Sequence, residues 1–165
     1  MLTDIDTIAE AIATHASTCA KKLRKQKSYA ISLMVFIHTN NFREDLPQYW
    51  KNTVLHLPVP TNDTQEIVHY ALAGLKTIFM NGYQYKKAGV IITEITEGAQ
   101  LGLFDSVDRE KRERLQQAID KINGEHNQFV KLAIQGTGRD WKLKQEQLSG
   151  CYTTDINQII DINCR

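Results

Sequence analysis

The hydrophobic pattern changes its period near residue 28, and this change determines how the chain must begin to fold. Before it, apolar residues recur at steps of three and four, which predicts an amphipathic helix from about Asp4 to Lys25. Thr3 and Asp6 are expected to cap the start of this helix. From Tyr29 to His38 apolar residues alternate with other side chains, which predicts a strand in the interior of a sheet.

A second strand and the start of a second helix follow. Thr53–Leu57 favours a short strand, and Pro58 and Pro60 are expected to end it, because proline has no N–H for a sheet ladder. Asp63, with Glu66 three residues later, has the pattern of a helix N-terminus.

The second helix should end at Asn81-Gly82, and a third strand is predicted from Lys86 to Thr96. The first hundred residues therefore have the order α-β-β-α-β, which is the ferredoxin-like order with its first strand missing. This order predicts an α+β fold: a sheet with both helices on one face, then a small α-rich C-terminal region. Because the missing strand would be central, we expect a changed strand order, a dimer or pairing of the segment near Phe129 to fill its place.

The last third of the chain is more polar. A strongly charged helix is predicted from Asp108 to Asn123. Its apolar face consists of Leu115, Ala118, Ile119 and Ile122. The alternation from Gln128 to Ile134 favours a further strand.

The composition is that of an ordinary globular domain. The 165 residues are 42% hydrophobic and 24% charged, and the formal charge is +1, so any affinity for nucleic acid must come from local patches. Three widely spaced cysteines without a CxxC motif favour free thiols in a reducing compartment. There is no basic leader and no apolar run of membrane-spanning length, so we expect a cytoplasmic protein that does not enter a membrane.

Catalytic signatures are missing from the sequence. We find no GxSxG, P-loop, GxGxxG, HExxH or paired-carboxylate motif. We therefore expect no catalytic residues, metal or cofactor in this chain. A small enzyme or ligand-binding domain with an unrecognised site remains an alternative, and its site would use His15, His38 or Cys19.

The sharpest local signal is the peptide Gln100-Leu101-Gly102-Leu103-Phe104. It resembles the QLxLF peptide with which bacterial polymerases and repair proteins dock on the sliding clamp. The chemistry suits that task, because a glutamine amide both donates and accepts hydrogen bonds and a Leu-Phe pair fills an apolar cleft. Gln100, Leu101, Leu103 and Phe104 are thus predicted to bind the clamp. The alternative is that this segment anchors a turn on the core.

Motifs on both sides of this peptide extend the resemblance. Tyr83–Val90, Gly136–Leu148 and Tyr152-Thr153-Thr154 are similar, in this order, to segments near the end of UmuC-like proteins. These are Y-family translesion DNA polymerases, the family of the catalytic subunit of DNA polymerase V. The ordered set spans nearly the whole chain and is more specific than any single motif.

The resemblance implies three parts: a little-finger DNA-binding domain at residues 1–99, a sliding-clamp-binding peptide at 100–105 and a UmuC-type C-terminal region at 106–165. The little finger of such polymerases grips primed DNA through phosphate contacts that do not depend on base sequence. The candidate DNA-binding residues in this chain are Lys86, Lys87, Arg43, Lys51, Thr39, Asn40 and Asn41.

The resemblance also implies a function. The chain would be a noncatalytic portion of a translesion (SOS mutagenesis and repair) polymerase that binds primed DNA and docks on the clamp. The catalytic palm, which would use Mg²⁺, lies elsewhere in such proteins. A UmuD-like subunit and a recombinase filament are further expected partners. The alternative is a stand-alone clamp-binding adaptor that does not touch DNA.

Overall fold

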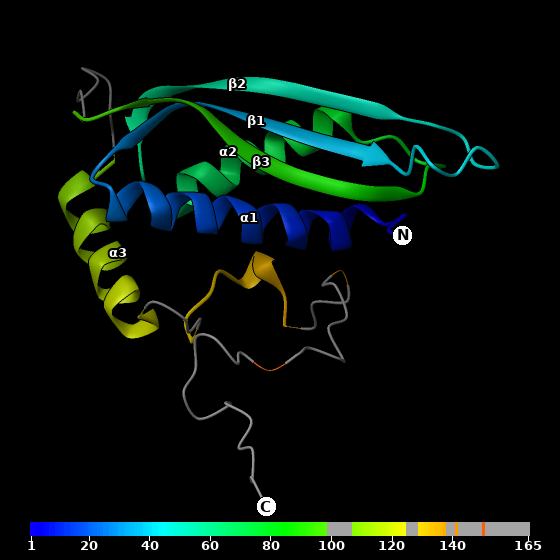
Figure 1. The fold of residues 1–165 in the computed structure, drawn as a ribbon. Helices are drawn as coiled ribbons and strands as arrows, with labels where there is room; N and C mark the ends of the chain where they lie inside the picture. The colour runs from blue at the N-terminus through cyan, green and yellow to red at the C-terminus, as the bar shows by residue number, and fades with distance from the viewer. Residues whose placement is uncertain (99–106, 125–128, 138–140, 142–149, 151–165) are drawn as a thin grey trace, which may run out of the picture.

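The computed structural model describes residues 1–98, 107–124, 129–137, Trp141 and Gly150 (Figure 1). The elements follow one another as α1 (Ile5–Lys25), β1 (Tyr29–Thr39), β2 (Trp50–Thr61), α2 (Thr64–Ile78), β3 (Tyr85–Thr96), α3 (Arg109–Asn123) and the short 3-10 helix η1 (Ala133–Gln135). The predicted α+β class and the order α-β-β-α-β are confirmed.

Helix α1 begins at Ile5, and its cap lies one residue later than predicted. The carboxylate of Asp4 accepts a hydrogen bond from the backbone N–H of Thr7 at 3.0 Å and thereby caps the helix. Thr3 is not the cap, and Asp6 lies in the first turn, where its charge complements the helix dipole. The buried stripe of α1 contains many alanines, which let the helix lie close to its neighbours: Ile8, Ala11, Ile12, Ala13, Ala16, Ala20 and Leu23.

The sheet has three antiparallel strands in the order β2-β1-β3. β1 is central, as its pattern predicts, and it is hydrogen-bonded to a neighbour on each side. The centre of the sheet is thus filled, and of the expected routes it is a changed strand order that fills it, with β1 between β2 and β3. Leu2 makes an antiparallel bridge to Tyr85, with N–O distances of 2.9 and 2.8 Å, on the edge of β3 that faces away from β1.

Strand β2 continues through the two prolines that were expected to end it. It runs to Thr61, because an edge strand has one side that needs no N–H for a neighbour. The register between β1 and β2 shifts near these prolines. Ser32 of β1 is opposite His56, whereas Ala30 is opposite Thr61. This irregularity takes up the extra residues of β2 around Pro58 and Pro60.

Both helices pack on one face of the sheet, as predicted, and they also pack on each other (Figure 1). The core lies between the helices and this face, and its fully buried large side chains are Ile8, Ile12, Leu33, Val35, Ile37, Ile67 and Leu75. Gly74 of α2 lies close against the sheet, since a Cβ there would lie 2.7 Å from Leu55 Cδ1 of β2. None of the described helices lies on the opposite face of the sheet.

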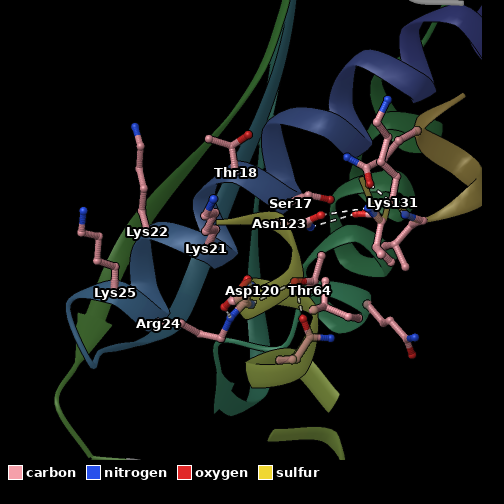
Figure 2. A pocket seen from close by; sticks show the side chains of 16 residues that line it. Ser17, Thr18, Lys21, Lys22, Arg24, Lys25, Thr64, Asp120, Asn123 and Lys131 are labelled. Atoms are coloured by element: carbon pink, nitrogen blue, oxygen red, sulfur yellow. Dashed lines mark hydrogen bonds and ion pairs between the residues drawn. The ribbon is translucent and has the colours of Figure 1, made fainter. Parts of the chain in front are cut away.

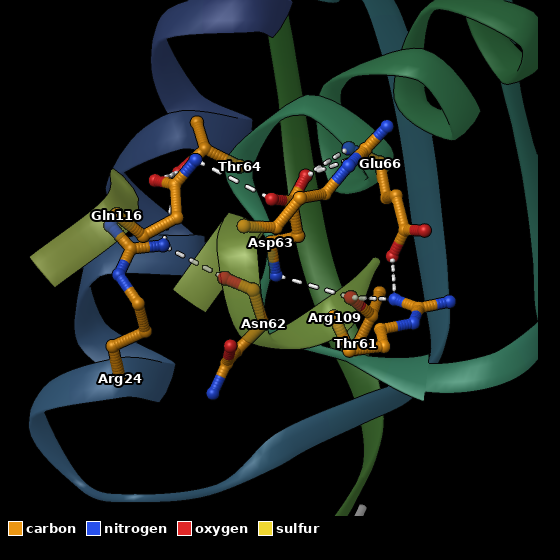
Figure 3. A network of polar contacts seen from close by, with 9 residues as sticks. Arg24, Thr61, Asn62, Asp63, Thr64, Glu66, Arg109 and Gln116 are labelled. Atoms are coloured by element: carbon orange, nitrogen blue, oxygen red, sulfur yellow. Dashed lines mark hydrogen bonds and ion pairs between the residues drawn. The ribbon is translucent and has the colours of Figure 1, made fainter. Parts of the chain in front are cut away.

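Helix α3 is attached by polar contacts instead of its apolar face (Figure 3). Leu115 and Ile122 are 47% and 56% exposed, whereas Gln116 is buried. Asp63, the N-cap of α2, receives hydrogen bonds from Glu66 N at 2.9 Å and from Gln116 Nε2 at 3.4 Å. The same carboxylate lies 3.3 Å from Arg112 Nη1.

Two further ion pairs hold this helix at its ends. Arg24 of α1 pairs with Asp120 at 2.6 Å, and Arg109 pairs with Glu66 at 2.6 Å. Within the described part of 125–137, residues 129–132 form no strand, and the predicted strand at Gln128–Ile134 is wrong. This segment lies against α1 through η1 and does not extend the sheet.

We expect Asp63→Ala to lower the free energy of unfolding by about 1–3 kcal/mol, because both the cap of α2 and the attachment of α3 are lost. Asp63→Asn keeps a capping oxygen and should cost less than about 1 kcal/mol. Asp4→Ala is the matched control, since this exposed cap has no contact with α3. Urea unfolding measures all three, and equal losses for Asp63→Ala and Asp4→Ala would contradict the linking role of Asp63.

Candidate nucleic-acid interface

The face of the sheet that carries no helix is a continuous surface, here called the open face. Strand register places every second residue of the three strands on it. It is formed by Met34, Phe36, His38, Trp50, Asn52, Val54, His56, Lys87, Gly89, Ile91 and Thr93. Three large apolar side chains of this face are well exposed: Trp50 at 69%, Val54 at 49% and Ile91 at 45%. An exposed apolar surface of this kind is typical of a binding site.

A row of rings crosses the open face. The ring centroids of Phe36 and His38 are 5.0 Å apart, and those of His38 and Trp50 are 5.3 Å apart in an edge-to-face arrangement. Gly89 of β3 makes room for this row, because a Cβ there would lie 2.6 Å from the ring of Phe36. The absence of a side chain at Gly89 therefore lets Phe36 lie against the sheet.

Lys87 supplies the positive charge of the open face. It is opposite His38 in the β1–β3 register. Partial burial and, to a smaller extent, the charge of Lys87 lower the pKa of His38 below its ordinary value of 6.5. The first acid of β3 after Lys87 is Glu94, towards the other end of the strand. A phosphate group would thus be attracted at the end of the face where Lys87 lies.

The other predicted lysines lie elsewhere. Strand alternation turns Lys86 away from the open face, and its Nζ is 3.5 Å from Asn40 Oδ1 in the β1–β2 loop. Lys51 is exposed on β2 and pairs in register with Ile37, whose side chain faces the helices. Lys87 is therefore the predicted lysine that joins the ring row.

The predicted loop residues are largely engaged with the loop itself. Arg43 makes two hydrogen bonds to the carboxylate of Asp45, at 2.7 and 2.6 Å, which holds the pKa of that carboxyl below its usual value. Thr39 is buried and donates its hydroxyl to Gln48 Oε1 at 2.8 Å. Asn40 is half-buried and accepts from the N–H of Phe42 at 3.4 Å, whereas Asn41 is exposed.

Sequence reasoning missed the rings of the open face, including Trp50 and Phe36. The available signal is their spacing, because Trp50, Asn52 and Val54 alternate along β2, whereas the predicted strand begins only at Thr53. The predicted clamp-binding residues Gln100, Leu101, Leu103 and Phe104 lie outside the described residues.

The side chains of the alternative enzyme site do not come together. His15 and Cys19 lie on α1, which packs on the helix-covered face, whereas His38 is on the open face. Burial raises the pKa of the Cys19 thiol, which disfavours the reactive thiolate. Among the described residues, no cluster of three or more His, Cys, Asp or Glu side chains has the geometry to hold a metal ion. No helix within those residues is long and apolar enough to cross a membrane.

The impB/mucB/samB family C-terminal domain matches residues 1–103. The chain belongs to this family. This result confirms the resemblance to UmuC-like Y-family proteins that the sequence motifs indicated. Residues 113–162 match a second domain, which is described as a domain of unknown function.

Individual relatives cover nearly the whole chain. Protein ImpB of Salmonella typhimurium is 36% identical over 96% of this chain and 38% of its own length. Protein SamB of the same organism is 34% identical over 93% of this chain and 37% of its own length. Protein UmuC of the LT2 strain is 30% identical over 98% of this chain and 39% of its own length. The chain thus spans less than two-fifths of the length of these relatives.

The lowered pKa of His38 gives stability a defined pH dependence. As the pH falls below about 6.5, the unfolded chain takes up a proton at His38 more readily than the folded chain, so stability decreases. Burial lowers the pKa of His15 and adds to the same trend. We expect urea unfolding to show a smaller loss between about pH 7.5 and 5.5 for His38→Gln. His69→Gln, at an exposed position of α2, is the control. An unchanged loss in His38→Gln would contradict this assignment.

Proposed function

We propose that this chain is the portion of a translesion DNA polymerase that holds primed DNA and tethers the enzyme to the sliding clamp. The DNA-binding part of this proposal is supported by the open face of the sheet and by membership in the impB/mucB/samB family. The clamp-binding part is supported by the QLGLF sequence of the peptide Gln100-Leu101-Gly102-Leu103-Phe104.

The open face has the properties that sequence-independent DNA binding needs. Lys87 offers a charged donor to phosphate, and Asn52 and Thr93 add polar side chains on the neighbouring strands. The rings and aliphatic side chains between them offer contact area for sugars, and such contacts do not select a base sequence. Because the helices cover the other face, DNA can approach this one without displacing any described part of the fold.

The charges on this surface are few, so DNA binding by this chain alone should be weak. One phosphate contact changes affinity by a small factor, and the chain as a whole has a charge of only +1. A second weak attachment through the clamp peptide then has a large effect, since it makes DNA binding effectively intramolecular. Two weak contacts would hold the polymerase at a stalled primer end and would still let it dissociate so that another polymerase can take its place.

Catalysis belongs to the remainder of the polymerase in this proposal. The chain would polymerise nothing alone, and the Mg²⁺ of the reaction would be held by the palm. A UmuD-like subunit and a recombinase filament are the further partners that this function implies. A cytoplasmic location follows from the same role, because both DNA and the clamp are found there in bacteria.

Lys87→Ala should weaken binding to primer-template DNA about threefold to tenfold and reduce the salt dependence by roughly one released counterion. Lys86→Ala is the matched control: it removes the same charge one residue away, but from the other side of the strand, and should change affinity less than about twofold. Fluorescence anisotropy at several salt concentrations measures both. Equal effects of the two variants would show that the open face is not the binding surface.

Replacing both Leu103 and Phe104 by alanine should abolish binding to a bacterial sliding clamp. We expect the unmodified chain to bind with a dissociation constant on the order of micromolar, as a short peptide anchor would. Surface plasmon resonance on immobilised clamp measures the affinity, and Leu115→Ala, an exposed leucine of α3, is the control. Undiminished binding by the double variant would remove the clamp tether from the proposal.

The two experiments together separate the proposal from its alternative. A stand-alone clamp-binding adaptor would bind the clamp through Leu103 and Phe104 but would show no salt-dependent affinity for DNA.

A further inference from the structure

A pocket of about 360 Å³ lies on the helix side of the molecule (Figure 2). The last turns of α1, the first turn of α2, α3 and residues 130–135 form its walls. It is separate from the open face, because α1 and α2 cover the opposite side of the sheet. Its volume is within the range of sites that bind a small ligand or one or two side chains of a peptide.

The charge of this pocket differs from that of the rest of the chain. Five cationic side chains line it against one carboxylate, that of Asp120, which gives a local charge of +4 compared with +1 for the whole protein. Figure 2 shows Lys21, Lys22 and Lys25 along α1, with Lys131 on the far wall. The cations are Lys21, Lys22, Arg24, Lys25 and Lys131. Such a concentration of one sign attracts an anionic ligand.

The polar groups deeper in the pocket are occupied within the protein. Arg24 uses Nε and Nη2 on Asp120 and Nη1 on the carbonyl of Asn62 and the hydroxyl of Thr64. The amide of Asn123 donates to the carbonyl of Val130 and accepts from its N–H, at 2.9 and 2.8 Å. These hydrogen bonds hold the walls of the pocket in place, so the pocket is formed without a ligand.

Apolar side chains complete the lining. Ile119 of α3 and Val130 and Leu132 of the following segment face the pocket, together with the aliphatic stems of the lysines. The pocket therefore combines an apolar interior with ammonium groups at its edge. This combination requires a ligand that has an apolar group with negative charges on either side of it.

We propose that this pocket binds an acidic peptide segment of a partner protein, with one large apolar side chain in the pocket and the flanking carboxylates on Lys22 and Lys131. A DNA backbone suits it less, because a duplex is convex and gains nothing from an apolar interior. A nucleotide suits it less as well, because the side-chain amides of Asn123 and Gln135 already bind backbone groups and are less available to a base. This inference does not depend on the DNA-binding role of the open face.

The test uses the full chain and a fluorescein-labelled peptide with one leucine between two pairs of glutamates. Lys22→Glu combined with Lys131→Glu should weaken binding about tenfold, because both ammonium groups at the edge become repulsive. Lys51→Glu combined with Lys76→Glu is the control, since it makes the same charge change at exposed positions outside the pocket. Its effect should remain below about twofold. Circular dichroism verifies that both double variants are folded.

Two further probes test the apolar part of the site. A peptide with serine in place of leucine should bind several-fold more weakly, and ATP should not displace the leucine peptide at equal concentration. Equal weakening by the two double variants would reduce the effect to general charge attraction and overturn the proposal. Displacement by ATP with no preference for leucine would make it a phosphate site instead. A complete lack of peptide binding would overturn the proposal outright.

Discussion

The structure depends on a sheet that the described helices cover on one side only. β1 is hydrogen-bonded along both edges, and its inward side chains, such as Val35 and Ile37, are fully buried beneath α1 and α2. Among the described elements, α1 and α2 form one layer on the sheet and none lies on the other face. Within the described part of the chain, the open face therefore follows from the placement of both helices on one side, and its rings and Lys87 are not covered by any described element.

The interactions that attach α3 differ from those that hold the core together. The core is held by apolar burial, whereas α3 is held by ion pairs and hydrogen bonds that meet at Asp63 and Arg24. Such contacts are partly exposed, each stabilises the fold modestly, and salt screens them. They nevertheless set the position of α3, and through it they form the basic pocket. The protein thus has one surface made by strand register and another made by charge pairing.

The sequence pattern predicted the elements well but predicted their limits and contacts less well. Apolar periodicity located both main helices because their stripes face the core, and Asp63 was recognised as a cap because its partner, Glu66, is local. Pro58 and Pro60 misled the prediction, because a pattern does not reveal which strand lies at the edge. The polar attachment of α3 was missed for a related reason, since Gln116 is buried by residues far away along the chain.

The sequence by itself determined the periodicity of each segment, and from that the order α-β-β-α-β and the family resemblance. These features depend only on the order of residues along the chain, which the sequence contains in full. Only the tertiary structure decided that Lys86 and Lys87 are on opposite sides of β3, that Lys87 joins His38 and Trp50, and that β1 lies between its two partners. Those facts depend on strand register and strand order, which are set by packing between segments distant in sequence.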